Sequence, residues 1–187
     1  ALPVVSRPSR LAEYEPRTYP SKLLRGAARR GDWTLHFVSQ RPAFRTRFSE
    51  LTGTCCFKTI AAFSNAEGGT LILGVSDDME IIGLENDYQA LKNGTKDEFQ
   101  LHLQNLTNHA YGVDFSSSNL DISFPLVEDT EICVVEIKPW NKPLYTTMSD
   151  KNGVKTDKFY LRCGNSSPEL PMKKILYLLY TKFFIFR

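Results

Sequence analysis

Two adjacent carboxylates are the first residues of this sequence whose type and position suggest chemistry. Asp77 and Asp78 follow the stretch KTIAAFSNAEGGTLILGVS, at the point where a strand-like run ends. Carboxylates at such a place can hold a hard cation through their oxygens. Aspartates are equally the residues of an ordinary turn between two strands, so a turn without chemistry explains the same pair.

Residues 138–162 combine positive charge with aromatic rings, a composition used to bind phosphates and unstacked bases. The basic residues are Lys138, Lys142, Lys151, Lys155, Lys158 and Arg162, and the rings are Trp140, Tyr145, Phe159 and Tyr160. A polar turn at 162–167 follows, whose N–H groups and hydroxyls can face an anion. The candidate nucleic-acid-binding residues are Lys138, Lys142, Lys155, Lys158, Arg162, Gly164, Asn165 and Ser166. A solvated hairpin with lysines at its edges would have the same composition.

Several other kinds of site are not indicated by the sequence. It contains neither GxxxxGK[ST] nor a GxGxxG that leads from a strand into a helix, so nucleotide hydrolysis lacks support. His102 and His109 are seven residues apart, about 10 Å along a helix, which is too far for one metal ion to bridge them. The four cysteines form no CxxC pair and are expected to be reduced, packed thiols. We expect no metal and no cofactor.

Length and charge indicate one globular domain with a basic extension. The chain has 187 residues, 42% of them hydrophobic, and a net charge of +2. Residues 1–50 nevertheless carry ten Lys and Arg against four Asp and Glu, so positive charge is concentrated there. We expect residues 1–31 to be a basic arm or a partner-bound segment. The absence of an initiator Met suggests a fragment or processed product. Neither a signal peptide nor an apolar run of membrane-spanning length is seen, so a cytoplasmic location is expected.

The helices and strands that would position these residues are predicted from the spacing of apolar residues and from the glycines and capping residues between them. Apolar spacing predicts a helix from about Gly53 to Glu67 that Gly68 and Gly69 end, followed at once by the strand TLILGV. Gly74 and the polar residues after it predict a turn into EIIGLE. A capping box at Thr95 and Glu98 begins a second helix, which has Phe99, Leu103, Leu106 and Ala110 on one face.

The remaining apolar stretches read as strands and one more helix. TLHFV, DISF, EICVVEI and KFYLRCG are predicted strands, and in EICVVEI the even and odd positions should face opposite sides of the sheet. A last apolar helix is predicted to begin near Pro171 and, being apolar around its circumference, to need a cover such as a second subunit. This order predicts an α+β domain with a mixed sheet and packed helices.

Residues 55–172 resemble the Schlafen-type divergent Alba domain. The resemblance rests on KTIAAFSNAEGGTLILGVSDDMEIIGLENDY, KDEFQLHLQNL, EICVVEIKPWNKPLY and FYLRCGNSSPEL taken together. It implies that residues 32–187 form a Schlafen-type Alba-like domain. It further implies nucleic-acid binding in a bacterial regulatory or defence protein, such as a transcriptional regulator that binds DNA. Alba-type domains are commonly dimeric, which favours a homo-oligomer.

The resemblance also raises the question of cleavage. Relatives that cut RNA use two glutamates near an E-F-K motif and an aspartate after the glycine-glycine strand. In this sequence GDWTLHFVSQ stands in the first place, with His36 in the position of the second glutamate and Val38 in that of the lysine. The aspartate position is kept by Asp77 or Asp78. The chain is therefore expected to bind nucleic acid without cutting it. The alternatives are a divergent metal-dependent nuclease that uses Asp77 and Asp78, and an oligomerisation or sensor module.

Overall fold

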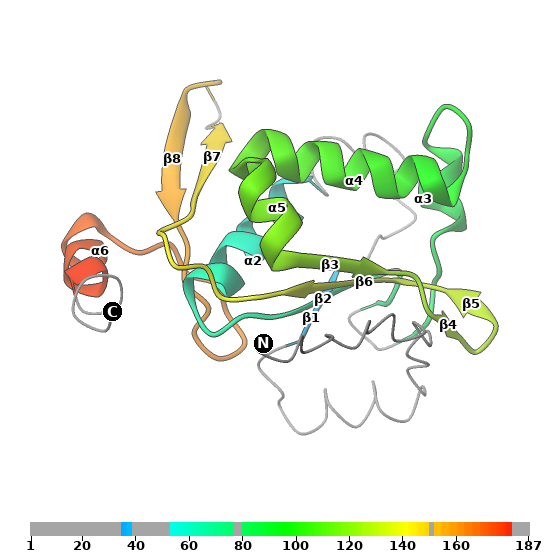
Figure 1. Ribbon diagram of the computed structural model, residues 1–187, viewed down its shortest axis with the longest axis horizontal. Coiled ribbons are helices and arrows are strands. Elements are labelled where there is room, and N and C mark those ends of the chain that lie inside the picture. Colours follow the sequence, from blue (N-terminus) through cyan, green and yellow to red (C-terminus); the bar gives the residue numbers. More distant parts are fainter. Residues whose placement is uncertain (1–34, 39–52, 77–79, 150–151, 181–187) are drawn as a thin grey trace, which may run out of the picture.

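The computed structural model describes residues 35–38, 53–76, 80–149 and 152–180, and the side chains from Cys56 onward within these ranges. The predicted arm at 1–31 lies outside the described residues, as do Asp77, Asp78 and Lys151. Figure 1 shows the arrangement of the described elements along the chain.

A four-stranded mixed sheet forms the base of the fold. Its strands are β1 (Leu35–Val38), β2 (Gly69–Leu73), β3 (Leu120–Ser123) and β6 (Cys133–Ile137), in the order β1-β2-β6-β3. β1 runs parallel to β2, and the other pairs are antiparallel. The predicted strands TLHFV, TLILGV, DISF and EICVVEI are thereby confirmed. Together with the helices they make the α+β fold that was expected.

Helices cover one face of this sheet. They are α2 (Gly53–Asn65), α4 (Lys96–Tyr111) and α5 (Val113–Asn119), which lie above the sheet in Figure 1. The main hydrophobic core fills the space between the layers and includes Phe63, Leu71, Phe99 and Val135, all at most 1% exposed. A smaller cluster around Ile72 and Val134 lies on the opposite face. The alternation predicted within EICVVEI is confirmed, because Cys133, Val135 and Ile137 belong to the first cluster and Ile132 and Val134 to the second.

The three glycines that follow α2 have different structural roles. Gly68 adopts a φ of +85° and donates its N–H to the carbonyl of Phe63 at 2.9 Å, which ends the helix. A Cβ at Gly68 would lie 2.6 Å from the carbonyl oxygen of Ile137, so a side chain has no room there. Gly69 is already the first residue of β2. At the other end of β2, the carbonyl of Gly74 accepts the N–H groups of Ile82 and Gly83, both at 2.9 Å, and closes the turn.

Helix α4 begins as its sequence predicts. The hydroxyl of Thr95 accepts the N–H of Glu98 at 3.3 Å, while the Glu98 carboxylate accepts the N–H of Asn93 at 2.7 Å. The predicted cap is confirmed, although the returning bond goes two residues further back than in a standard capping box. Phe99 and Leu103 are buried on the predicted face. Leu106 is only partly covered, and Ala110 is exposed.

The local structure differs from the sequence-based expectations in three places. A short helix that the sequence analysis did not predict, α3 (Glu85–Gln89), begins at the last residue of EIIGLE. Helix α5 was missed because its VDFSSSN sequence is rich in serine and asparagine, which compete with a helical backbone. The strand expected at 158–164 is instead β8 (Lys155–Phe159), because the N–H of Arg162 bonds to the carbonyl of Ala62 and leaves the ladder.

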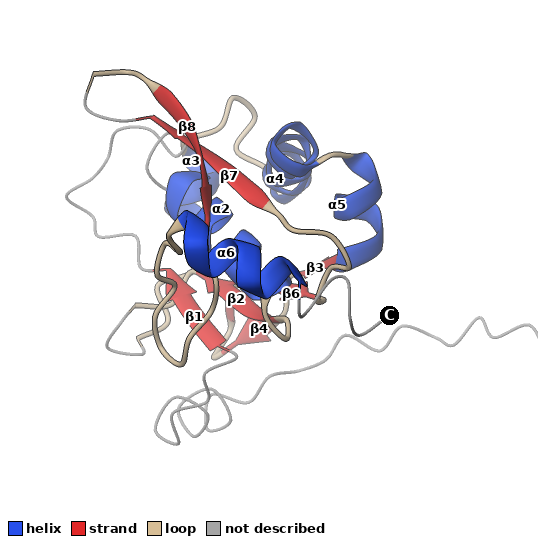
Figure 2. Cartoon of the chain, turned by 90° about the vertical axis from the view of Figure 1, so that its left-hand side faces the viewer, coloured by secondary structure: helices blue, strands red, loops and turns tan. Residues whose placement is uncertain are grey.

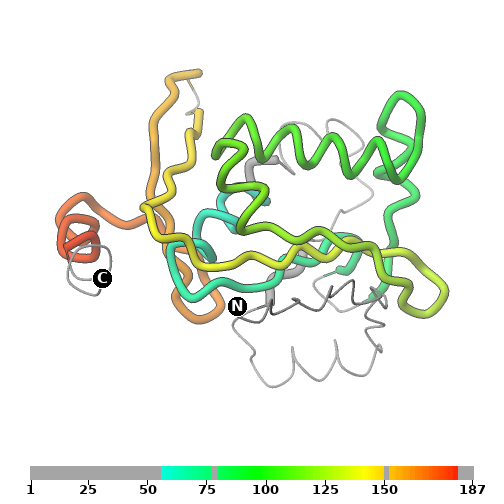
Figure 3. The backbone as a smooth tube through the Cα atoms, in the orientation of Figure 1, coloured from blue at the N-terminus to red at the C-terminus, as the bar shows by residue number. Residues whose placement is uncertain are grey.

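Two hairpins and a short helix complete the described structure. β4 (Leu126–Val127) and β5 (Thr130–Glu131) form a small hairpin whose turn residues, Glu128 and Asp129, both have positive φ. β7 (Tyr145–Ser149) pairs with β8 in a second, separate hairpin that stands away from the sheet in Figure 3. α6 (Met172–Leu178) begins directly after Pro171, as predicted, and lies on the outside of the molecule in Figures 1 and 2.

Candidate nucleic-acid interface

The β7–β8 hairpin carries two of the predicted lysines and is anchored by one buried side chain. Asn65, the last residue of α2, is fully buried. Its amide nitrogen donates to the carbonyls of Leu144 at 2.8 Å and Tyr160 at 2.9 Å, and its amide oxygen accepts the N–H of Leu144 at 2.8 Å. One side chain thus holds the beginning of β7 and the end of β8.

The end of α2 also positions the segments on either side of the hairpin. The last carbonyls of a helix have no partner within the helix. Here the carbonyl of Ser64 accepts the N–H of Trp140 at 3.0 Å, and that of Ala62 accepts the N–H of Arg162 at 3.1 Å. The backbone on both sides of the hairpin is therefore held at the same helix end.

Lys138 and Lys142 are exposed just before the hairpin. The ammonium of Lys142 lies 5.6 Å from the ring centroid of Trp140, a cation–π contact. The same ring meets Phe115 edge to face, with the centroids 5.6 Å apart. Trp140 is therefore engaged with the fold on one side and with Lys142 on another.

Lys155 and Lys158 lie on opposite faces of the hairpin. They are three positions apart in β8, and side chains alternate between faces along a strand. Lys155 stands opposite Ser149 and Lys158 opposite Thr146. The Lys158 ammonium forms a 2.8 Å ion pair with Glu169, and the hydrogen bond with this carboxylate raises the pKa of Lys158. The structure does not bring the two lysines to one flat surface.

Arg162 is the predicted residue most involved in packing. Its guanidinium carbon lies 5.0 Å from the ring centroid of Phe63, a core residue, and one of its nitrogens donates to the Ser167 hydroxyl at 3.3 Å. Burial lowers the pKa of this guanidinium from its usual value, yet an arginine stays protonated at neutral pH. Arg162 covers the core while it contributes positive charge to the surface.

The predicted anion-facing turn is a closed, exposed loop. Cys163 and Ser166 exchange backbone hydrogen bonds of 2.9 and 3.2 Å, and the Ser166 hydroxyl donates to the carbonyl of Cys163. Gly164 occupies the positive-φ position, at +59°. Within the described part of the chain, the N–H groups of Gly164 and Asn165 have no hydrogen-bond partner. Two of the three residues predicted for this turn therefore offer backbone donors.

Two of the four rings expected beside the cations are buried and not available to stack on bases. Phe159 is 1% exposed and Tyr160 is 5% exposed. Tyr145 remains 39% exposed and meets Phe159 edge to face. Phe159, at the end of β8, and Tyr160, directly after it, are used in the protein interior, which leaves Tyr145 and part of Trp140 on this surface.

Sequence reasoning missed two charged residues of this region. Lys58 of α2 lies with its ammonium 5.1 Å from the ring centroid of Tyr160, 102 positions further along the chain. Glu169 reaches Lys158 because its backbone forms a bridge opposite Tyr160. Both contacts join segments that are distant in sequence or separated by a turn, and no local pattern indicates them.

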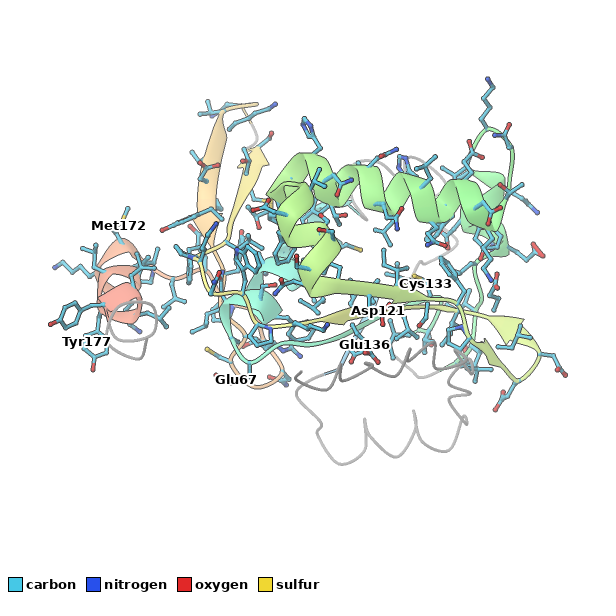
Figure 4. All side chains as sticks on the ribbon, in the orientation of Figure 1. Glu67, Asp121, Cys133, Glu136, Met172 and Tyr177 are labelled. Atoms are coloured by element: carbon cyan, nitrogen blue, oxygen red, sulfur yellow. The ribbon has the colours of Figure 1, made fainter. Side chains whose placement is uncertain are left out.

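The residues considered as possible metal ligands do not form a metal site within the described ranges. Asp77 and Asp78 lie outside these ranges. No three His, Cys, Asp or Glu side chains within them lie close enough together to hold a metal ion. Asp121 and Glu136 are opposite each other on β3 and β6, on the sheet face away from the helices, as Figure 4 shows. The histidines of α4, His102 and His109, do not form part of such a group either.

Comparisons with known proteins agree with the architecture. The family described as Schlafen, AlbA_2 matches residues 40–171 of the chain. Among solved structures, the DIP2311 protein from Corynebacterium diphtheriae is similar, with a TM-score of 0.50 and 14% sequence identity over 80% of this chain. The match covers 27% of that protein, and at this identity it indicates shared fold alone. The search of curated proteins found no match. Within the described residues, no helix is long and apolar enough to cross a membrane.

Proposed function

Because the chain belongs to the Schlafen AlbA_2 family, we propose that it is a nucleic-acid-binding module that holds phosphates through the β7–β8 hairpin and its flanks. The proposed contacts are Lys138, Lys142, Lys155, Lys158, Arg162, Gly164, Asn165 and Ser166. The observation that carries the proposal is the anchoring of this basic segment by Asn65 and the end of α2. Fixed cations beside exposed N–H groups suit a row of phosphates.

The proposed binding is electrostatic and does not depend on base stacking. Of the four predicted rings in this segment, Tyr145 is the exposed one, while Trp140 is half-buried and the other two are buried. The cations on both faces of the hairpin suit a groove, since a two-stranded ribbon fits into the major groove of DNA. We therefore favour DNA as the ligand and expect little sequence preference.

The biological setting of the module is a further part of this proposal, which the family resemblance supports. We propose that the module serves a bacterial regulatory or defence protein, such as a transcriptional regulator, in the cytoplasm. Self-association is part of this proposal, because α6 leaves Met172, Leu176 and Tyr177 more than 60% exposed. In Figure 4 the side chain of Tyr177 points away from the rest of the molecule, and Met172 lies at the upper edge of the helix.

Fluorescence anisotropy with labelled single- and double-stranded DNA and RNA tests the proposed binding. The logarithm of affinity should fall linearly with the logarithm of salt concentration. Replacing Lys138, Lys142 and Lys155 together with glutamine should reduce the slope by about 0.9 for each phosphate that the variant no longer neutralises. Lys92→Gln is the matched control, because Lys92 is exposed in the loop between α3 and α4. No binding at low salt would contradict the proposed function, and an unchanged slope in the triple variant would place the binding surface elsewhere.

A further inference from the structure

The ion pair between Lys158 and Glu169 is built by the backbone around it. After β8 the chain reverses through the turn at 163–166 and returns beside its own path. The N–H of Leu170 donates to the carbonyl of Phe159 at 2.9 Å, and Glu169 forms a bridge opposite Tyr160. Since Lys158 and Tyr160 lie on the same face of the strand, this bridge places the Glu169 carboxylate beside the Lys158 ammonium.

This carboxylate occupies the position that a phosphate oxygen would take. Its Oε2 lies 2.8 Å from the Lys158 nitrogen, the distance of a charge-assisted hydrogen bond to either a carboxylate or a phosphate. Glu169 is also half exposed, with 49% of its side chain accessible, so an incoming phosphate would meet its negative charge. A lysine already paired in this way releases fewer counterions when a phosphate arrives.

We propose that Glu169 is an intramolecular competitor of nucleic-acid phosphates for Lys158, and so limits the affinity of the hairpin. This inference rests on the proposed function and adds a residue that opposes binding. With Glu169 in place, Lys158 contacts a phosphate only by giving up its carboxylate partner, so this contact adds no net charge to the interface. Without it, Lys158 becomes a free cation on the hairpin face opposite Lys155.

The hairpin contains a matched control for the loss of charge. Asp157 is an exposed acid within β8, and its carboxylate accepts a hydrogen bond from the hydroxyl of Thr147 at 2.7 Å across the hairpin. Like Glu169→Gln, Asp157→Asn removes one negative charge, here from the strand that carries Lys158. No ion pair of Asp157 with a described lysine or arginine is seen, so this change frees no cation.

The experiment compares salt slopes of the full chain on a labelled DNA duplex, between about 50 and 200 mM salt. Glu169→Gln should raise affinity about two- to fivefold at the lower salt concentration and steepen the slope by about 0.9. Asp157→Asn should leave the slope unchanged. Lys158→Gln and the double variant with both Lys158→Gln and Glu169→Gln should share the slope of the wild type, because none of the three presents a free cation at position 158.

The outcomes separate the inference from the function on which it rests. If the wild type binds and Glu169→Gln has the same slope, the competition by Glu169 is refuted while the proposed function stands. The same holds if Asp157→Asn steepens the slope equally, since charge alone then explains the effect. If the wild type binds no nucleic acid, the proposed function fails and the inference fails with it. Thermal denaturation of each variant verifies that it is folded.

Discussion

The amide side chain of Asn65 pairs with the backbone of Leu144 in both directions, donating to its carbonyl and accepting from its N–H at 2.8 Å each. The two residues are 79 positions apart and both are buried. Neighbouring β-strands exchange pairs of N–H···O=C hydrogen bonds in the same way, but here a side-chain amide takes the place of one strand's backbone. It joins the helical layer to the hairpin that carries the candidate interface.

Asn65→Ala should lower the free energy of unfolding by about 3 kcal/mol or more, because it leaves several buried backbone groups without partners. Asn65→Asp should also destabilise the fold, since a carboxylate oxygen would face the carbonyls of Leu144 and Tyr160. Urea denaturation measures both effects. Asn105→Ala, at an exposed position of α4, is the control and should change stability little. A loss below about 1 kcal/mol in Asn65→Ala would contradict the anchoring role.

Gly68→Ala should destabilise the protein more than Gly153→Ala, although both glycines have similar positive φ values of 85° and 79°. The added Cβ at 68 would meet the Ile137 carbonyl at 2.6 Å, whereas nothing lies within 4 Å of a Cβ at 153. The second variant therefore reports the backbone strain alone, about 1–2 kcal/mol. Equal losses in denaturation experiments would show that the backbone at Gly68 shifts without cost.

The fold could largely be predicted because most of its elements have local sequence signals. Thr95 predicted the beginning of α4, and the alternation in 132–137 predicted both faces of β6, since cap chemistry and strand period act over a few residues. Helix α5 could not be predicted, because its local sequence signal favours a different structure. Its serines indicate a loop, and only its packing, with Phe115 in the core, makes it helical.

For the candidate site, the sequence predicted which charged residues are present but not where they lie in the fold or what they contact. Lys155 and Lys158 looked like one surface, yet strand alternation places them on opposite faces. Arg162 and Tyr160 looked like interface residues, and both are partly used by the core. Their partners, Phe63 and Asn65, lie about a hundred positions earlier, so sequence patterns that act locally cannot assign them.

The protein should lose stability in alkali through its buried tyrosines. Burial raises the pKa of both Tyr88 and Tyr111, and the Glu131 carboxylate bonded to Tyr88 adds to the first shift. In the unfolded chain a tyrosine loses its proton near pH 10, where these two keep theirs in the folded state. Their contribution is therefore complete below pH 10 and is lost as the pH rises above it.

Free energies of unfolding between neutral pH and pH 11 measure this effect. Tyr111→Phe should make the decline above pH 10 shallower by up to about 1.4 kcal/mol per pH unit. It should also lower stability at pH 7, because the Tyr111 hydroxyl donates to the carbonyl of Phe57 at 2.7 Å and is hydrogen-bonded to the side-chain hydroxyl of Thr146 at 2.9 Å. A wild type whose stability is constant up to pH 11 would contradict the prediction.

Self-association through α6 should be weakened by charge on its outer face. Leu176 is 61% exposed. Covering an exposed apolar helix face with a second copy of the chain removes apolar surface from water and so lowers the free energy of the dimer. Light scattering at several concentrations should show a dimer for the wild type and a monomer for Leu176→Glu. Leu101→Glu is the matched control, since this leucine of α4 is 57% exposed. A wild type that is monomeric at every concentration would remove the homo-oligomer from the proposal.

The last prediction is that the chain does not cleave nucleic acid. Metal-assisted phosphodiester cleavage needs several carboxylates to hold the cation that offsets charge at the phosphate. The positions that resemble the motif of cleaving relatives hold His36 and Val38, whose backbone lies in β1 beside Leu71 and Leu73. Asp77 and Asp78 then remain as the acids that the resemblance supplies.

We therefore expect no cleavage of tRNA, single-stranded RNA or DNA with Mg²⁺ or Mn²⁺, measured on denaturing gels. The double variant Asp77→Asn with Asp78→Asn is the decisive comparison. Cleavage that persists in this variant would come from a contaminant, because the proposed ligands are gone. Cleavage that survives repurification of the wild type and disappears in the double variant would instead establish the divergent nuclease and overturn a purely binding role.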